Sequence, residues 1–289
     1  MPHRNSPINM SQKTPKVILI TGASSGIGRD AALLLARQGH RVYAAARRAQ
    51  LLEDLRSEGI VPLPMDVTDH ASMAAGVDQL LKAEGRIDVL VNNAGYGYFG
   101  PIEEVHLEEA RRQLEVNVFG LADLCRLVLP TMRKQHSGRI VNTSSIAGRL
   151  VLPFGGWYHV SKYSVEALSD ALRMELQPFG IKVSMIEPGG IRTDWGIIAA
   201  KHLFESADGG PYGEEALAEA RLIDRVYRGR WLTDPARVAH AICRAVNSRC
   251  PRARYRLGRF SHSAVVLHAL LPARCWDALL RRFMSIRID

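Results

Sequence analysis

The chain has 289 residues, of which 47% are hydrophobic and 23% are charged, a composition typical of a folded globular protein and not of a disordered one. No apolar run reaches the 18 residues that a transmembrane helix needs, and residues 1–14 lack the apolar stretch of a signal peptide. We therefore expect a cytoplasmic protein with a disordered tail at residues 1–14. Four scattered cysteines without a CxxC pair favour free thiols over disulfides or a metal site.

The net charge of +9 is unevenly distributed along the chain. Residues 221–289 contain 15 Arg, no Lys and 4 Asp, which gives +11, so the first 220 residues carry −2. A basic segment can bind nucleic acid or an anionic membrane, or it can simply be solvated. Because no nucleic-acid-reading motif accompanies these arginines, we expect no nucleic-acid partner.

Short apolar runs bounded by glycines alternate with segments of helical spacing from residue 17 to residue 191. This alternation predicts an α/β fold with a doubly wound parallel sheet of Rossmann type, covered by helices on both faces. We predict one domain at residues 15–260, with a small helical lid at about 194–232 and a helical extension at 261–289. The predicted strands are 17–20, 40–48, 60–67, 87–95, 138–145 and 181–191, and the predicted helices are 29–39, 49–59, 70–85, 107–135 and 158–180.

Three glycines, Gly22, Gly26 and Gly28, form the motif TGASSGIG between the first strand and the first helix. Glycine at this turn lets the backbone approach a pyrophosphate, which then lies at the helix N-terminus. Glycines alone are weak evidence, but the strand before them and the helix after them strengthen the interpretation. Their spacing, G-x3-G-x-G, resembles that of the short-chain dehydrogenase/reductase superfamily.

The second strand ends in Arg47 and Arg48, with no acidic residue nearby. An Asp or Glu at this place binds the 2′-hydroxyl of NAD(H), whereas an arginine suits the 2′-phosphate of NADP(H). The sequence therefore favours NADP(H) over NAD(H), with Arg47 the favoured contact and Arg48 beside it.

Further motifs of the same superfamily follow in order over residues 15–195. They are NNAG at 92–95, a single Asn at 117, NTSS at 142–145, YHVSK at 158–162 and EPGGIRT at 187–193. The resemblance implies a catalytic set of Asn117, Ser145, Tyr158 and Lys162. It also implies a cofactor site made of Gly22, Ser24, Ser25, Gly26, Ile27, Gly28, Arg47, Arg48, Asp66, Val67, Asn93, Ala94, Gly95, Tyr158, Lys162, Pro188, Gly189, Ile191 and Thr193.

Tyr158 and Lys162 lie four residues apart, so they share one face of a helix, whereas Tyr163 points elsewhere. Carbonyl reduction needs an acid that protonates the developing alkoxide, and a nearby ammonium lowers the pKa of a phenol. We therefore expect Lys162 to lower the pKa of Tyr158. By the resemblance, Lys162 also binds the nicotinamide ribose, and Asn117 kinks its helix around a water that links Lys162 to solvent.

Two neighbouring serines compete for the role of hydrogen-bond donor to the substrate oxygen. Ser145 lies 13 residues before Tyr158, which is the superfamily's usual separation, and Ser144 would face the opposite side of a strand. We favour Ser145.

Apolar side chains follow Thr193 in the predicted lid, and they either bind an apolar substrate or pack the lid onto the body. They are Trp195, Ile197, Ile198, Leu203 and Phe204, and a second apolar stretch covers residues 150–154. In the extension, arginines alternate with apolar residues. A helix packed on the body or on a partner subunit is favoured there over weak membrane-surface association, because Pro272 interrupts the stretch.

The sequence thus predicts an NADP(H)-dependent oxidoreductase that interconverts a carbonyl and an alcohol on an apolar substrate. The resemblance is greatest to the hydroxysteroid/retinol dehydrogenase-like branch, and it implies a homodimer or homotetramer. The alternative is a catalytically silent NADP(H)-binding regulatory protein, against which the complete set of four catalytic residues argues.

Overall fold

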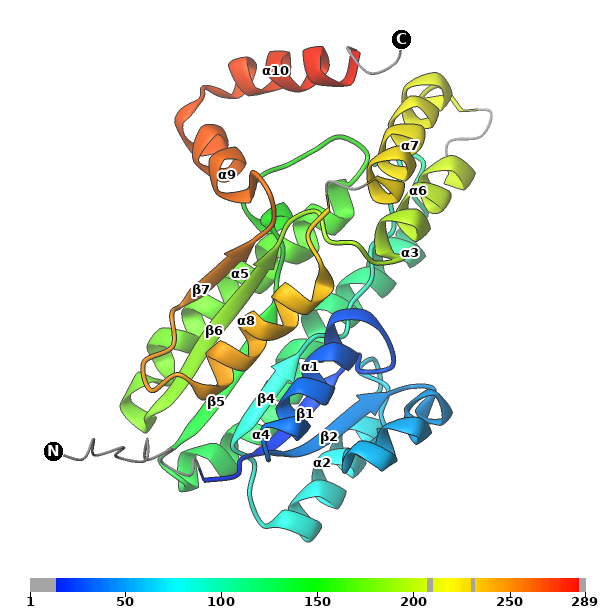
Figure 1. Ribbon diagram of the computed structural model, residues 1–289. Helices are drawn as coiled ribbons and strands as arrows, with labels where there is room; N and C mark the ends of the chain where they lie inside the picture. The colour runs from blue at the N-terminus through cyan, green and yellow to red at the C-terminus, as the bar shows by residue number, and fades with distance from the viewer. Residues whose placement is uncertain (1–13, 207–209, 230–231, 286–289) are drawn as a thin grey trace, which may run out of the picture.

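A seven-stranded parallel sheet forms the centre of the computed structural model, which describes residues 14–206, 210–229 and 232–285 (Figure 1). The strand order is β3-β2-β1-β4-β5-β6-β7, and every neighbouring pair is parallel. The order reverses between β1 and β4, which is where ligands bind in doubly wound sheets. The strands are β1 (Val17–Thr21), β2 (Arg41–Ala46), β3 (Val61–Pro64), β4 (Val89–Asn92), β5 (Gly138–Thr143), β6 (Ile181–Pro188) and β7 (Arg254–Leu257). The predicted tail lies outside the described residues, apart from Thr14.

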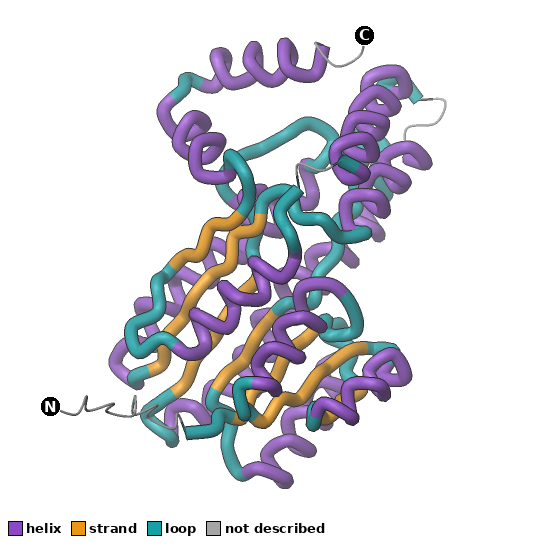
Figure 2. Tube along the Cα trace, in the orientation of Figure 1, coloured by secondary structure: helices purple, strands orange, loops and turns teal. Residues whose placement is uncertain are grey.

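Helices cover both faces of the sheet, as predicted (Figure 2). One hydrophobic core lies between the sheet and α1, η1 and α8, and a second lies between the sheet and α2, α4 and α5. The α-helices are α1 (Gly26–Arg37), α2 (His70–Glu84), α3 (Leu107–Leu114), α4 (Gly120–Lys134), α5 (Gly156–Glu175), α6 (Trp195–Ser206), α7 (Gly213–Arg228), α8 (Pro235–Asn247), α9 (Ser261–Leu270) and α10 (Ala273–Ser285). The other helical segments are η1 (Ala49–Glu58), η3 (Ile146–Gly148) and η4 (Gln177–Phe179), which are 3-10 helices, and η2 (Glu115–Phe119), a π-helix.

Local sequence explains where several helices begin and end. The carboxylate of Asp69 accepts a hydrogen bond from the Ala71 amide at the start of α2, and Gly85 ends that helix in the left-handed conformation. Asp234 caps α8 in the same way, and Pro235 occupies its first turn.

Two predicted helices differ in detail from the structure. Residues 49–58 form a 3-10 helix instead of an α-helix, and its buried residues, Leu52 and Leu55, have the three-residue spacing that suits such a helix. The single long helix predicted at 107–135 is divided by the π-helical turn η2. Strand β7 was not predicted, because it has only four residues and two of them are arginines.

Helices α6 and α7 lie side by side at the carboxyl end of the sheet, within the range predicted for the lid (Figure 1). The extension forms α9 and α10, which pack on the body through a small cluster of Leu150, Val265 and Trp276. The Trp276 indole also donates a hydrogen bond of 3.3 Å to the Val151 carbonyl. None of the helices in the described ranges is long and apolar enough to cross a membrane.

Candidate active site

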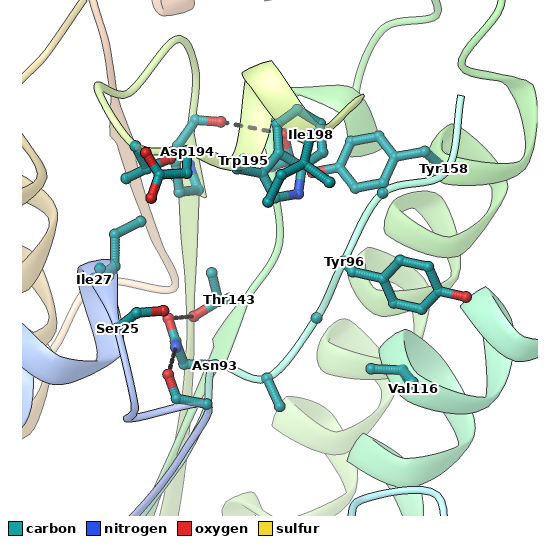
Figure 3. Close-up of a pocket in the computed structure, with 18 of the residues that line it drawn as sticks. Ser25, Ile27, Asn93, Tyr96, Val116, Thr143, Tyr158, Asp194, Trp195 and Ile198 are labelled. Carbon is teal, nitrogen blue, oxygen red and sulfur yellow. Dashed lines mark hydrogen bonds between the residues drawn. The ribbon is translucent and has the colours of Figure 1, made fainter. Parts of the chain in front are cut away.

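A cavity of about 1380 Å³ opens at the carboxyl ends of the strands, where the strand order reverses. It runs from the glycine turn after β1 to the helices α6 and α7, and Figure 3 shows part of its wall. Of the predicted site residues, all but Gly28 and Asn117 line it. Those that line it are Gly22, Ser24, Ser25, Gly26, Ile27, Arg47, Arg48, Asp66, Val67, Asn93, Ala94, Gly95, Ser145, Tyr158, Lys162, Pro188, Gly189, Ile191 and Thr193.

The glycine turn brings three backbone segments into close contact. Gly22 has a φ of +64°, and a Cβ atom there would lie 2.8 Å from the Cα atom of Ala94. A Cβ atom on Gly28 would lie 2.4 Å from the Gly22 carbonyl oxygen. Gly28 is therefore a packing residue behind the cavity wall, and only a residue without a side chain fits at either position.

Helix α1 begins at this turn, and its N-cap residue Ser25 makes no side-chain capping hydrogen bond. The amide groups of the first turn of α1 therefore remain available to an anionic ligand at the cavity edge. Asn93 fixes the turn from β4, because its side-chain amide donates to the carbonyl oxygens of Thr21 and Gly22, each at 3.3 Å.

The end of β2 supplies positive charge to the cavity. Arg47 and Arg48 are both exposed and line it. Asp66, which follows β3, also lines it, and its carboxylate accepts hydrogen bonds from the amide and hydroxyl of Thr68 at 3.0 and 2.8 Å. No acidic residue follows β2 before η1 begins at Ala49.

Asn117 lies at the middle of η2, behind the cavity wall. Its side chain accepts a hydrogen bond from the Tyr96 amide at 3.1 Å and donates to the Tyr96 carbonyl at 2.9 Å and to the Ser161 hydroxyl at 3.0 Å. A Cβ atom on Gly95 would lie 3.0 Å from Asn117 Oδ1 and 3.7 Å from Lys162 Nζ. The π-helical turn thus brings Asn117 close to the ammonium group of Lys162.

Tyr158 and Lys162 lie on one face of α5, and both are buried at the cavity. Lys162 Nζ donates a hydrogen bond of 3.0 Å to the Thr143 carbonyl and lies 5.8 Å from the centre of the Tyr158 ring. The Ser145 hydroxyl interacts with Tyr158 and also donates to the Pro188 carbonyl at 3.2 Å. Tyr163 does not line the cavity and is 39% exposed.

The pKa of Tyr158 shifts in the direction opposite to the one expected from its spacing to Lys162. Burial raises the pKa of the Tyr158 phenol, and Ser145 only partly opposes this effect. Burial also lowers the pKa of Lys162 to about 8, against the attraction of Glu166. Removal from water disfavours the charged form of both groups, and here it outweighs their neighbours.

The lid residues divide between the two roles left open by the sequence. Trp195 and Ile198 line the cavity (Figure 3). The centres of the Trp195 and Tyr158 rings are 4.9 Å apart. Leu203 is fully buried and packs the lid onto the body, whereas Phe204 is 52% exposed and Ile197 lies outside the cavity. In the second apolar stretch, Leu152 lines the cavity, while Leu150 packs against the extension.

His159 and Tyr227 are wall residues that the sequence did not reveal. His159 Nδ1 donates to the Ala147 carbonyl at 2.9 Å, and Nε2 accepts from the Leu152 amide at 3.0 Å, so the ring is the neutral tautomer with its proton on Nδ1. It fixes the loop that carries Leu152 into the cavity. Tyr227 arrives from α7 and lies 6.4 Å from Trp195, ring centre to ring centre. His159 lies inside the YHVSK motif, but the resemblance implies no role for it, and Tyr227 belongs to no motif, so only the tertiary structure reveals their positions in the wall.

The chain is similar in sequence to a known protein family and to several curated proteins. The family model described as short chain dehydrogenase matches residues 16–201. The chain is 37% identical to the 3-ketodihydrosphingosine reductase of Bacteroides thetaiotaomicron over 281 residues, covering 94% of this chain and 99% of the relative. It is 40% identical to the 17-beta-hydroxysteroid dehydrogenase type 1 of Mus musculus, covering 83% of this chain and 73% of the relative.

Two solved structures with bound cofactor share the fold. A short chain dehydrogenase/reductase from Burkholderia phymatum in complex with NAD is 28% identical with a TM-score of 0.76, covering 92% of this chain and 95% of the other. A metagenomic short-chain oxidoreductase in complex with NADP is 26% identical with a TM-score of 0.67, covering 86% of this chain and 98% of the other. The chain belongs to the short-chain dehydrogenase/reductase family, whose members are oxidoreductases that act on CH–OH groups with nicotinamide cofactors.

Proposed function

We propose that this protein is an NADP(H)-dependent oxidoreductase that interconverts a carbonyl and an alcohol on an apolar substrate of the steroid, retinoid or long-chain aldehyde or ketone type. One observation carries the proposal. Tyr158, Lys162 and Ser145 line the same continuous cavity as the glycine turn and the two arginines after β2. A proton donor and a dinucleotide site therefore share one space.

The residues of the cavity fit a nicotinamide dinucleotide. Gly22 and the uncapped start of α1 suit the pyrophosphate, because the backbone there leaves room and offers amide donors. Arg47 and Arg48 suit a 2′-phosphate, which supports NADP(H) over NAD(H). Asp66 and Val67 would flank the adenine, and Pro188, Gly189, Ile191 and Thr193 would cover the nicotinamide end.

When bound, the cofactor supplies or accepts a hydride at the substrate carbon. In the direction of reduction, the Tyr158 hydroxyl gives its proton to the substrate oxygen as negative charge develops on it. Ser145 donates a hydrogen bond to the same oxygen. The Lys162 ammonium stabilises the tyrosinate that remains, and Asn117 holds the surrounding backbone in place through Tyr96.

The substrate end of the cavity is largely apolar, with Phe99, Leu152, Trp195 and Ile198 in its wall. Such a wall suits a substrate with a large hydrocarbon body. The two relatives are named for 3-ketodihydrosphingosine and for a 17-beta-hydroxysteroid, which supports the same class of substrate.

The proposal extends to the setting of the enzyme, which we infer to be a cytoplasmic homodimer or homotetramer. The extension also presents exposed apolar side chains, Val266 and Leu270 on α9 and Leu279 on α10, and exposed arginines, Arg274 and Arg282 on α10. Such a surface suits contact with a partner subunit or weak association with an anionic membrane.

The decisive experiment follows NADPH oxidation with a panel of steroid ketones, 3-ketodihydrosphingosine, retinal, long-chain aldehydes and small diketones. Tyr158→Phe should lower kcat on the best substrate by about 100- to 10,000-fold, because the variant has no proton to give. Its affinity for NADPH, measured by fluorescence titration, should remain within about twofold of the wild type. Undiminished turnover in the variant would contradict the proposal, and tight NADPH binding without turnover on any compound would favour the regulatory alternative.

A further inference from the structure

Three consecutive residues at the end of β5 meet three successive turns of α5. The Ser145 hydroxyl interacts with Tyr158, and the Thr143 carbonyl accepts from Lys162. The Ser144 hydroxyl lies near Glu166, one turn beyond Lys162. Residues four apart on a helix share a face, so Tyr158, Lys162 and Glu166 form one line along α5.

Glu166 is a buried carboxylate that the catalytic set does not include. It is 5% exposed, and Arg254 of β7 lies 3.1 Å from its Oε2 atom. Burial raises the pKa of this carboxyl, an effect that the nearby Ser144 hydroxyl and Arg254 oppose. Neither Ser144 Oγ nor Glu166 Oε1 completes a hydrogen bond with any residue in the described ranges. A buried carboxylate with an oxygen left unpaired costs stability, so the presence of Glu166 at this position needs an explanation.

Helix α5 is held tightly against η3 at this point. A Cβ atom on Gly148 would lie 2.8 Å from the Lys162 carbonyl oxygen and 2.9 Å from Glu166 Cγ. The backbone of Lys162 and the side chain of Glu166 therefore rest against the same residue. This contact fixes the position of the carboxylate relative to the helix turn that carries Lys162.

Arg254 anchors the carboxylate from the other side. Its guanidinium group also binds Asp170 and lies 3.1 Å from Glu187 Oε1. Glu187 is completely buried on β6 and is paired with Arg256 at 2.7 Å. Arg254 opposes the rise in the pKa of Glu166 that burial and Glu187 cause, and it thereby favours the ionised form of this carboxyl.

We propose that Glu166, anchored by Arg254, is a positioning residue that keeps the Lys162 ammonium charged and in place at the active site. Lys162 is buried, with 6% of its surface exposed, and a buried amine without an opposite charge loses its proton readily. Glu166 is the charged residue that opposes this loss. The inference rests on the proposed function, since it concerns the same catalytic lysine.

The polar and titratable groups that face Lys162 and Glu166 come from α5, η2, β5, β6 and β7. Lys162 faces the neutral side chains of Tyr158 on α5 and Asn117 on η2, together with the Thr143 carbonyl of β5. Glu166 faces Glu187 of β6, Arg254 of β7 and the neutral Ser144. Beyond these, Asp170 and Arg256 contact Arg254 and Glu187, and Arg173 pairs with Asp170 at 3.2 Å.

Nuclear magnetic resonance tests the proposal without reference to activity. The chain has only seven lysines, so a protein labelled at lysine Cε gives few signals, and the Lys162 signal is assigned by its loss in Lys162→Met. The wild-type Lys162 should titrate with a pKa of about 8. In Glu166→Gln the pKa should fall by about one unit or more, because the favourable charge is gone.

Asp170→Asn is the matched control, because it removes a carboxylate from the same arginine one turn farther from Lys162. It should leave the pKa of Lys162 within about 0.3 unit of the wild type, as should Glu166→Asp, which retains the charge. An unchanged pKa in Glu166→Gln would overturn the proposal. If that variant does not fold, Arg254→Gln decides the question: with its anchor lost, Glu166 binds a proton, and the Lys162 pKa should again fall.

The pH profile of turnover then links the charge to catalysis. In Glu166→Gln, Lys162 should lose its proton at a lower pH than in the wild type. The alkaline limb of the kcat/KM profile should therefore move about one pH unit toward acid, and kcat/KM at pH 8 should be about fivefold lower. A role confined to folding would lower activity at all pH values alike, and that result would overturn the proposal. A lysine pKa that shifts as expected in a protein without turnover on any substrate would instead count against the proposed function alone.

Discussion

At the glycine turn between β1 and α1 the cavity wall is backbone, whereas at the other end, between η3 and α6, it is made of side chains. Gly22, Gly28 and Ala94 approach so closely that their geometry depends on the absence of side chains. Trp195, Leu152 and Tyr227 come from three separate segments and line the cavity, and the Trp195 and Tyr227 rings lie side by side there. The first region suits a ligand common to a whole family, and the second can change its ligand by changing side chains.

The largest effect should come from adding one methyl group to the backbone-built end. Gly28→Ala places a Cβ atom 2.4 Å from the Gly22 carbonyl, and neither backbone segment can move without opening the turn. We expect NADPH affinity to fall by about 100-fold or more and stability to fall by about 1–3 kcal/mol. Calorimetric titration with NADPH and thermal unfolding would measure the two effects.

Gly39→Ala is the control for this substitution. Gly28 lies within α1, whereas Gly39 follows that helix in the left-handed region with a φ of +82°, and a Cβ atom on Gly39 meets nothing within 4 Å. It should cost about 1 kcal/mol of stability and leave NADPH affinity unchanged. Equal loss of affinity in both variants would show that the close packing at Gly28 does not shape the cofactor site.

A smaller effect should follow from the charges at the edge of the same region. Arg47→Asp replaces a guanidinium group by a carboxylate at the end of β2. The carboxylate repels a 2′-phosphate and accepts a hydrogen bond from a 2′-hydroxyl, so the ratio of kcat/KM for NADPH over NADH should fall by about 10- to 100-fold. Arg41→Asp, at the opposite end of β2, should leave that ratio unchanged, and an unchanged ratio in Arg47→Asp would argue against the assignment of this contact.

The difference between the backbone-built end and the side-chain-built end of the cavity also explains which features the sequence could predict. The sheet, most helices and the glycine turn follow from short-range patterns, because strand periodicity and glycine spacing act over a few residues. The placement of Tyr158 and Lys162 on one helix face follows equally from their spacing. The burial that raises the pKa of Tyr158 depends on α6 and α7, which lie far along the chain, so spacing alone gave the wrong direction.

Contacts between distant segments also account for the features that the sequence did not reveal. The pairing of Arg254 with Glu166 joins residues 88 apart, and no local pattern marks it. His159 is adjacent to Tyr158, yet its role depends on a loop that folds back from η3. The π-helical turn around Asn117 was expected as a kink from the resemblance, and its extent follows from the contacts with Tyr96 and Ser161.

The smallest effect should be a loss of stability when the loop that carries Leu152, at the side-chain-built end of the cavity, is no longer held by His159. His159→Phe keeps the ring size but leaves the Leu152 amide and the Ala147 carbonyl without their partner, at a cost of about 1–3 kcal/mol.

Burial lowers the pKa of His159 from its ordinary value of 6.5, so the folded protein binds this proton less readily than the unfolded chain. The contribution of His159 to stability is therefore complete above pH about 6.5 and is lost as the pH falls below it. The difference in Tm between the wild type and His159→Phe should be largest near pH 8 and should narrow toward pH 5. His262→Phe, at an exposed position on α9, should show no such dependence. A Tm difference for His159→Phe that stays constant between pH 8 and pH 5 would mean that His159 does not hold the loop as the neutral ring.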